Sequence, residues 1–179
     1  MFHASVTPAP EPTGRGPLRR RLITAVLTGL TAVGLVVISP ASPARATAGQ
    51  CSNGANGFVD IHDDLRGIDA RTTYNPRWIG QRGGLGVYVR LYHGTVAGAD
   101  RGWAMIQGPT RPGDWVWMDV SLNGGKSVWV QCGPFSVDAP GLTKTSAAKA
   151  SSSSSSVRFR ACARMVGTPA STARCTSWW

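Results

Sequence analysis

The sequence predicts a mainly β fold: a small single-domain antiparallel sandwich or barrel of about six to eight short strands, held by two disulfides. Three observations lead to this class. Segments with period-two alternation recur along the chain, turn residues separate them, and no long apolar pattern of helical period follows residue 48. A chain of 179 residues has room for one domain with appendages, so one hydrophobic core is expected.

The N-terminal segment 1–48 has the three parts of a cleaved secretory signal peptide. Three arginines, Arg19 to Arg21, precede an uncharged run from Leu22 to Ile38, and small residues follow. We expect cleavage after Ala48, with a competing site after Ala46. An uncleaved membrane anchor is the alternative, and the arginines leave the general and twin-arginine export routes open. The protein is therefore expected to be secreted, with no membrane contact after cleavage.

Four cysteines, all after the predicted signal, indicate a disulfide framework. An even count in an exported chain favours disulfides over a metal site, and the sequence has no Cys-x-x-Cys pair. Three pairings are open. We favour Cys51 with Cys132 and Cys162 with Cys175, because the first ties the mature N-terminus to a strong hairpin and the second closes a short C-terminal loop.

Residues 49–138 are predicted to form the β domain. The part up to Gly86 has many turn residues and is expected to hold one short strand in a loop. The stretch 87–92 alternates strictly, with aliphatic side chains on one face and Tyr88, Arg90 and Tyr92 on the other. After a glycine-rich turn, residues 103–106 are predicted to form the next strand.

The clearest local signal is a β-hairpin. Two β-rich runs, 115–120 and 127–131, flank an Asn-Gly-Gly turn. The first run has an aliphatic face, and its opposite face carries Trp115, Trp117 and Asp119. We expect the aliphatic face to belong to the core.

The C-terminal part is expected to return to the β domain after a linker. Residues 139–156 are polar, include six consecutive serines and are predicted to form a flexible Ser/Ala-rich loop. Residues 157–179 are too few for a core of their own, so we expect a disulfide-closed hairpin that packs on the β domain. In it Phe159 should face inward, and Arg158 and Arg160 outward.

The sequence offers little to catalysis. Four metal-capable side chains lie close together, Asp60, His62, Asp63 and Asp64, but without calcium-loop spacing, so a solvated acidic loop competes with a metal site. No nucleophile motif is present, and no glutamate follows residue 48. We therefore expect no enzyme, metal or cofactor. A small secreted hydrolase that uses the aspartates with a histidine is the alternative.

Seven tryptophans, all after the predicted signal, are the most unusual feature. Indole faces stack on sugar rings, and rings two residues apart on a strand are spaced by about 7 Å, so they suit adjacent sugars. The alternatives are that the tryptophans fill the core or pair with arginines. The predicted ligand-binding residues are Trp115, Trp117, Asp119, Arg90, Tyr88 and Tyr92.

The charge favours an anionic partner. The chain carries 19 basic and 9 acidic residues, and removal of segment 1–48 takes five arginines and one glutamate, which leaves a net charge of about +6. For an exported protein this favours cell-wall polysaccharide or another anionic envelope polymer over nucleic acid, with simple solubility as the alternative. We expect a monomeric, non-catalytic extracellular binding module, with an inhibitor of a secreted enzyme as the competing function.

Two parts of the sequence resemble known protein families. The stretch from Ser121 to Trp129 resembles a degenerate Asp-box hairpin of the sialidase and propeller families, with Asn123 in place of the aspartate and Ser127 in place of the threonine. The box implies a structural hairpin and no activity. From Gly86 onward, the segments GWAMI, GDWVWMDVS, WVQCGPF, FRACAR and CTSWW resemble small secreted actinobacterial proteins of uncharacterised function. That resemblance implies export and one domain, and it supplies no catalytic residues.

Overall fold

The computed structural model describes residues 44–65, 71–72, 76–127 and 129–179. The chain divides into two units, Met1–Ile38 and Ser39–Trp179, and the second contains every described residue. The arginines and apolar run of the predicted signal lie outside the described residues. Among the described helices, none has the length and apolar character needed to cross a membrane.

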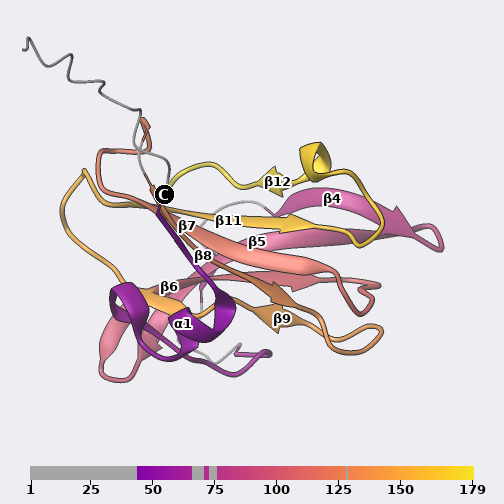
Figure 1. Cartoon of the computed structure of the whole chain (residues 1–179), viewed down its shortest axis with the longest axis horizontal. Coiled ribbons are helices and arrows are strands. Elements are labelled where there is room, and N and C mark those ends of the chain that lie inside the picture. Colours follow the sequence, from indigo (N-terminus) through magenta and orange to yellow (C-terminus); the bar gives the residue numbers. More distant parts are fainter. Residues whose placement is uncertain (1–43, 66–70, 73–75, 128) are drawn as a thin grey trace, which may run out of the picture. The chain divides into compact units, whose positions relative to one another are not determined.

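The described strands form two sheets, which confirms the mainly β class with antiparallel pairing (Figure 1). The five-stranded sheet has the order β1 (Ala44–Ala46), β8 (Trp129–Ser136), β7 (Trp115–Ser121), β11 (Arg158–Arg164) and β12 (Arg174–Cys175). The seven-stranded sheet has the order β2 (Phe58–Val59), β10 (Ala148–Ala150), β6 (Ala99–Gln107), β5 (Leu85–Val96) and β3 (Arg71–Thr72), with β4 (Arg77–Arg82) paired to β5 and β9 (Lys144–Thr145) paired to β6. Only β1 with β8 is parallel among these pairs.

The core lies between the sheets, because both present their aliphatic faces to it. Val116 and Met118 of β7 are fully buried, as are Val87 and Val89 of β5, and one cluster joins them. From β11, Phe159 packs into the same cluster, which confirms its predicted inward direction. The period-two alternation of the sequence therefore assigned these faces correctly.

The two predicted disulfides are present. Cys51 pairs with Cys132, which ties the helix α1 (Ala48–Ser52) to β8, and Cys162 pairs with Cys175 between β11 and β12. Two short 3₁₀ helices lie elsewhere, η1 (Ala55–Gly57) after α1 and η2 (Ala170–Thr172) inside the loop that the second disulfide closes.

The turn of the β7–β8 hairpin is held by side chains of the Asp-box-like segment. The Ser121 hydroxyl accepts the amide N–H groups of Asn123 and Gly125, and the Asn123 amide donates to Ser127 at 2.9 Å. Gly125 has a φ of +83°, and a Cβ there would lie 2.7 Å from the Trp178 ring, so only glycine fits this position. The hairpin turn thereby supports the indole of Trp178.

The predicted flexible loop 139–156 needs correction, because its middle belongs to the seven-stranded sheet. It contains β9 and β10, both paired with β6. Ala147 and Ala148 are fully buried, and the buried Ser146 hydroxyl accepts the Ala104 amide N–H at 3.0 Å. Small side chains let this segment lie flat along β6, so its sequence has none of the large apolar residues that identify a buried strand. The exposed part of the serine run is 152–156.

The folded unit begins earlier than the predicted cleavage site. β1 pairs with β8, and its residue Ala46 is buried in the core. Thr47 caps α1 by accepting the Gln50 amide N–H, and the Gln50 side chain accepts the Thr47 N–H in return. The strand and the cap both lie on the N-terminal side of residue 49.

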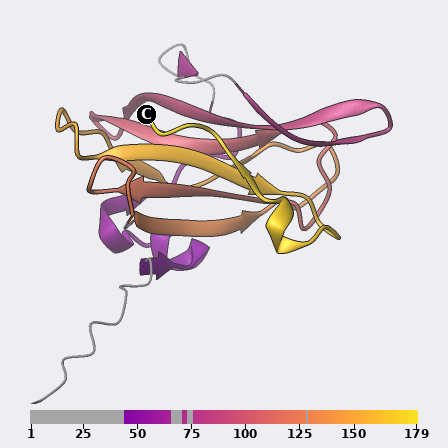
Figure 2. The same ribbon diagram turned by 90° about the horizontal axis from the view of Figure 1, so that it is seen from above.

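The described strands number twelve, more than the six to eight predicted. Six have at least six residues, whereas β1, β2, β3, β9, β10 and β12 have two or three; of these short strands only β2 was predicted, from the apolar patch at Phe58 and Val59. Short strands carry too little alternation to be found in the sequence. β4 was also missed, in the region predicted to be mostly loop, and the β4–β5 hairpin extends past the neighbouring strands (Figure 2).

Candidate functional site

The outer face of the five-stranded sheet gathers tryptophans and arginines, and we call it the tryptophan–arginine face. Strand register aligns Arg45, Gln131, Asp119 and Arg160 in one row across β1, β8, β7 and β11. On β7, Trp117 and Trp115 follow in the next rows, opposite Cys162 and Arg164 of β11. These indoles project away from the aliphatic core face, as the sequence predicted, and both are half-buried.

Asp119 and Arg160 form an ion pair on this face, in which Asp119 is buried and Arg160 is half-buried. An Asp119 oxygen lies 2.7 Å from Arg160 Nη2 and accepts Nε–H at 2.8 Å. The Arg160 guanidinium also stacks on two indoles, at 4.7 Å from the centre of Trp129 and 4.4 Å from that of Trp178. Burial raises the pKa of the Asp119 carboxyl, against the opposing effects of Arg160 and Arg45.

Asp119 is therefore not a free ligand-binding group. Only 2% of the residue is exposed, Arg160 binds its Oδ2 atom, and among the described residues its buried Oδ1 atom has no hydrogen-bond partner. The sequence placed it correctly on the face of Trp115 and Trp117, but its role there is to orient Arg160. This corrects the prediction that Asp119 is a ligand-binding residue.

Beside this ion pair the face is hollowed. The hollow has a volume of about 240 Å³ and is lined by Arg45, Trp115, Trp117, Gln131, Pro134, Arg164, Ala170 and Ala173. The Arg164 guanidinium stacks on Trp115, 4.1 Å from the ring centre. Two indoles and two guanidinium groups therefore share one concave surface.

A β-bulge in β8 makes room for Trp117. Register shifts between Val116 and Met118, so that β8 carries one extra residue opposite Trp117. Gly133 at this bulge has a φ of +118°, and a Cβ there would lie 2.9 Å from the Trp117 Cβ. Bulges commonly redirect side chains beside binding sites, and this one sets Trp117 against Pro134 in the hollow.

The disulfide-closed loop forms one wall of the hollow. Ala170 and Ala173, from and next to η2, line it, and their small side chains leave the space open. An inhibitor of a secreted enzyme would present such a loop outward as a rigid projection. Here the loop borders the hollow through Ala170 and Ala173, while several of its other residues, such as Val166 and Pro169, are exposed.

The other predicted site residues lie on the opposite sheet. Tyr88, Arg90 and Tyr92 occupy the outer face of β5, while the core face of that strand meets the five-stranded sheet. Tyr92 stacks on Trp103 and accepts a hydrogen bond from the Gln107 amide at 2.8 Å. The prediction that these three residues join Trp115 and Trp117 is wrong, because β5 and β7 belong to different sheets.

The seven tryptophans do not behave as a single group. Trp103 is 1% exposed and Trp78 is 53% exposed, whereas the other five are half-buried. Trp179 packs on Phe159 and His93 at one edge of the core. Each alternative therefore holds for some of the tryptophans. Trp103 is buried, and indoles of the tryptophan–arginine face stack on arginines.

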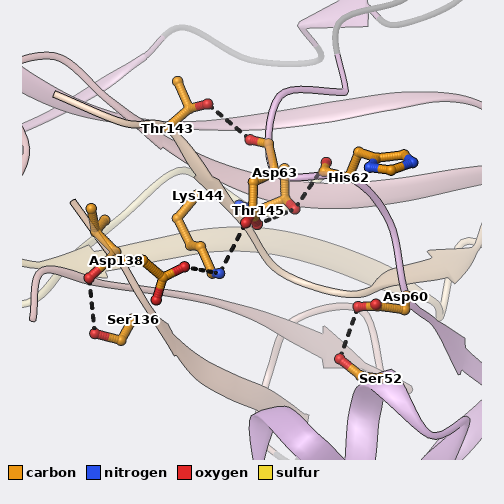
Figure 3. A network of polar contacts seen from close by, with 10 residues as sticks. Ser52, Asp60, His62, Asp63, Ser136, Asp138, Thr143, Lys144 and Thr145 are labelled. Atoms are coloured by element: carbon orange, nitrogen blue, oxygen red, sulfur yellow. Dashed lines mark hydrogen bonds and ion pairs between the residues drawn. The ribbon is translucent and has the colours of Figure 1, made fainter. Parts of the chain in front are cut away.

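The acidic side chains near residue 60 form ion pairs and hydrogen bonds that hold neighbouring segments of the chain together (Figure 3). Asp63 pairs with Lys144 at 2.9 Å, and Lys144 also pairs with Asp138. Asp60 accepts the Ser52 hydroxyl instead, and the exposed ring of His62 points elsewhere. Burial acts to lower the pKa of Lys144, but its hydrogen bonds to the two aspartates outweigh this and raise it.

Two further groups of metal-capable or titratable side chains occur among the described residues. The one described group of metal-capable side chains is Asp119 with Cys162 and Cys175, and a disulfide joins the two sulfurs. His93 lies 3.3 Å from Asp100, but the Ser151 hydroxyl donates to Asp100 rather than to the histidine ring.

Sequence reasoning found only Trp115 and Trp117 in the hollow and missed its polar residues Arg45, Gln131 and Arg164. A signal was present for Arg164, because it continues the outward alternation of Arg158 and Arg160 on β11. Arg45 was assigned to the cleaved segment, and Gln131 ended a predicted strand without any special pattern.

Comparison of the chain with protein-family models, with curated proteins and with solved structures finds no match.

Proposed function

We propose that the protein is a secreted, non-catalytic binding module whose tryptophan–arginine face holds a carbohydrate or another polymer of the cell envelope. One observation carries the proposal: Trp115 and Trp117 line the same hollow as the guanidinium groups of Arg45 and Arg164. Aromatic faces that border a concave surface with a few polar groups are typical of sugar sites. The two disulfides are compatible with an extracellular location.

The support is geometric as well as chemical. Strand β7 fixes the spacing of the two indoles, the bulge at Gly133 sets the position of Trp117, and Arg164 stacks on Trp115. A site built on paired strands loses little conformational entropy when a ligand binds.

The proposal predicts that the double variant Trp115→Ala/Trp117→Ala loses binding to cell-wall polysaccharide. Both side chains are half-buried, so the variant should lose less stability than the roughly 3 to 5 kcal/mol typical of a buried aromatic residue. Retention of the purified protein on insoluble cell-wall preparations, with its melting temperature, measures both effects.

Trp78→Ala is the matched control, because Trp78 is exposed on β4, in the other sheet. The control should bind as the wild type does. A folded double variant that is retained as strongly as the wild type would contradict the proposal.

A further inference from the structure

We infer that the ligand of the tryptophan–arginine face is an acidic sugar, that is, a sugar ring carrying a carboxylate or phosphate group. The inference rests on the proposed function and specifies the chemistry of its ligand. It follows from the hydrogen-bond donors and acceptors that line the hollow, from the absence of an ion pair at its two arginines among the described residues, and from its volume.

The side chains that line the hollow are rich in donors and poor in acceptors. Each guanidinium of Arg45 and Arg164 offers up to five N–H donors and no acceptor, and among these side chains only the Gln131 amide supplies a side-chain oxygen. A neutral sugar presents hydroxyl groups, which need acceptors as well as donors. Carboxylate and phosphate groups need donors only, so they match this lining.

The two arginines are available to such a group. Within the described part of the chain, the ion pairs engage Arg82, His93, Lys144 and Arg160, and neither Arg45 nor Arg164 forms one. The lining includes no acidic side chain, since the nearby Asp119 is buried and held by Arg160. Neither guanidinium group is neutralised by an acidic side chain in the lining of the hollow, which favours an anionic ligand there.

The stacking of Arg164 on Trp115 points the same way. A guanidinium that lies flat on an indole keeps its N–H edge free, and this edge matches the two oxygens of a carboxylate or phosphate. The indole of Trp117 then remains for the sugar ring. At about 240 Å³ the hollow is smaller than the roughly 300 to 1,000 Å³ of drug-sized sites, so it suits one ring and its charged substituent.

The test uses calorimetric titration of the full chain with three defined probes: a galacturonic acid trimer, a galactose trimer and glucose 1-phosphate. The acidic trimer should bind at least about tenfold more tightly than the neutral one, because hydrogen bonds to charged groups are the stronger ones. Its affinity should fall as salt is raised. The relative affinity of the sugar phosphate distinguishes a carboxylate from a phosphate preference.

Arg164→Gln should remove the preference, so that the acidic trimer binds no better than the neutral one. Arg164→Lys keeps the charge but loses the planar edge, and it should restore only part of the difference. Arg77→Gln changes the net charge equally at an exposed position on β4 and should leave the preference intact.

The outcomes separate the two claims. Equal binding of both trimers to the wild type, or a preference that Arg164→Gln leaves unchanged, overturns the acidic-sugar inference while the proposed function stands. If neither trimer nor the sugar phosphate binds but cell-wall retention still depends on Trp115 and Trp117, the inference again fails alone. If retention does not depend on them, the proposed function fails as well.

Discussion

At the scale of single residues, the most consequential group outside the site is Asp114. It is fully buried, yet its carboxylate is saturated by partners from three parts of the chain. It accepts two hydrogen bonds from the Arg82 guanidinium at the end of β4, one from the Arg111 amide at 2.9 Å and one from the Val166 amide at 2.8 Å. Asp114 therefore joins both sheets to the loop that walls the hollow.

Burial acts to raise the pKa of Asp114, but the hydrogen bonds from Arg82, Val166 and Arg111 outweigh it and hold the pKa below its usual range. A carboxyl with a depressed folded-state pKa contributes stability above its unfolded pKa and loses it as pH falls through the folded value. This contribution is therefore present at neutral pH and is lost below about pH 4.

Asp114→Asn should lower the free energy of unfolding by about 3 to 5 kcal/mol at neutral pH, because it leaves the Arg82 charge without its buried partner. Urea unfolding at a series of pH values measures this, and the difference from the wild type should shrink in acid. Asp138→Asn, which loses a more exposed pair with Lys144, is the control and should cost about 1 kcal/mol or less. A small, pH-independent effect of Asp114→Asn would contradict this role.

At the scale of elements, the strand β1 decides where the domain begins. Cleavage after Ala48 would remove β1, leave β8 as an unpaired edge and take away the Thr47 cap of α1. It would also remove Arg45 from the hollow. The structure therefore assigns residues 44–48 to the folded unit.

A chain that begins at Gly49 should be less stable than one that begins at Ser39, by about 1 to 3 kcal/mol. It loses the helix cap, the β1 hydrogen bonds and the buried Ala46. Denaturant unfolding of the two forms measures the difference, and a form that begins at Ala44 should match the longer one. Equal stability of all three forms would show that β1 contributes nothing.

At the scale of the whole molecule, the sequence predicted the features that depend on local residue patterns. Alternation along β5, β7 and β11 assigned their core faces, and the cysteine positions led to the correct pairing. It could not predict which strands share a sheet, since alternation carries no information on pairing partners. For that reason Arg90 was grouped with Trp115, although their strands lie in different sheets.

The other residues that line the hollow could not be predicted from the sequence for a similar reason. Arg45 comes from the very start of the folded unit, Gln131 and Pro134 from β8, and Ala173 from a loop near the C-terminus. Only the register of the five-stranded sheet and the second disulfide bring them together. None of these residues has a sequence signature of its own, whereas the closely spaced Trp115 and Trp117 do.

The central claim is that ligand binds at Trp115 and Trp117, and the indole N–H resonances of the seven tryptophans test it most directly. Titration of the ¹⁵N-labelled protein with a galacturonic acid trimer should shift the indole signals of Trp115 and Trp117. The signals of the buried Trp103 and of the exposed Trp78 on the other sheet should stay in place. Binding that shifts Trp78, or that leaves Trp115 and Trp117 unchanged, would contradict the account.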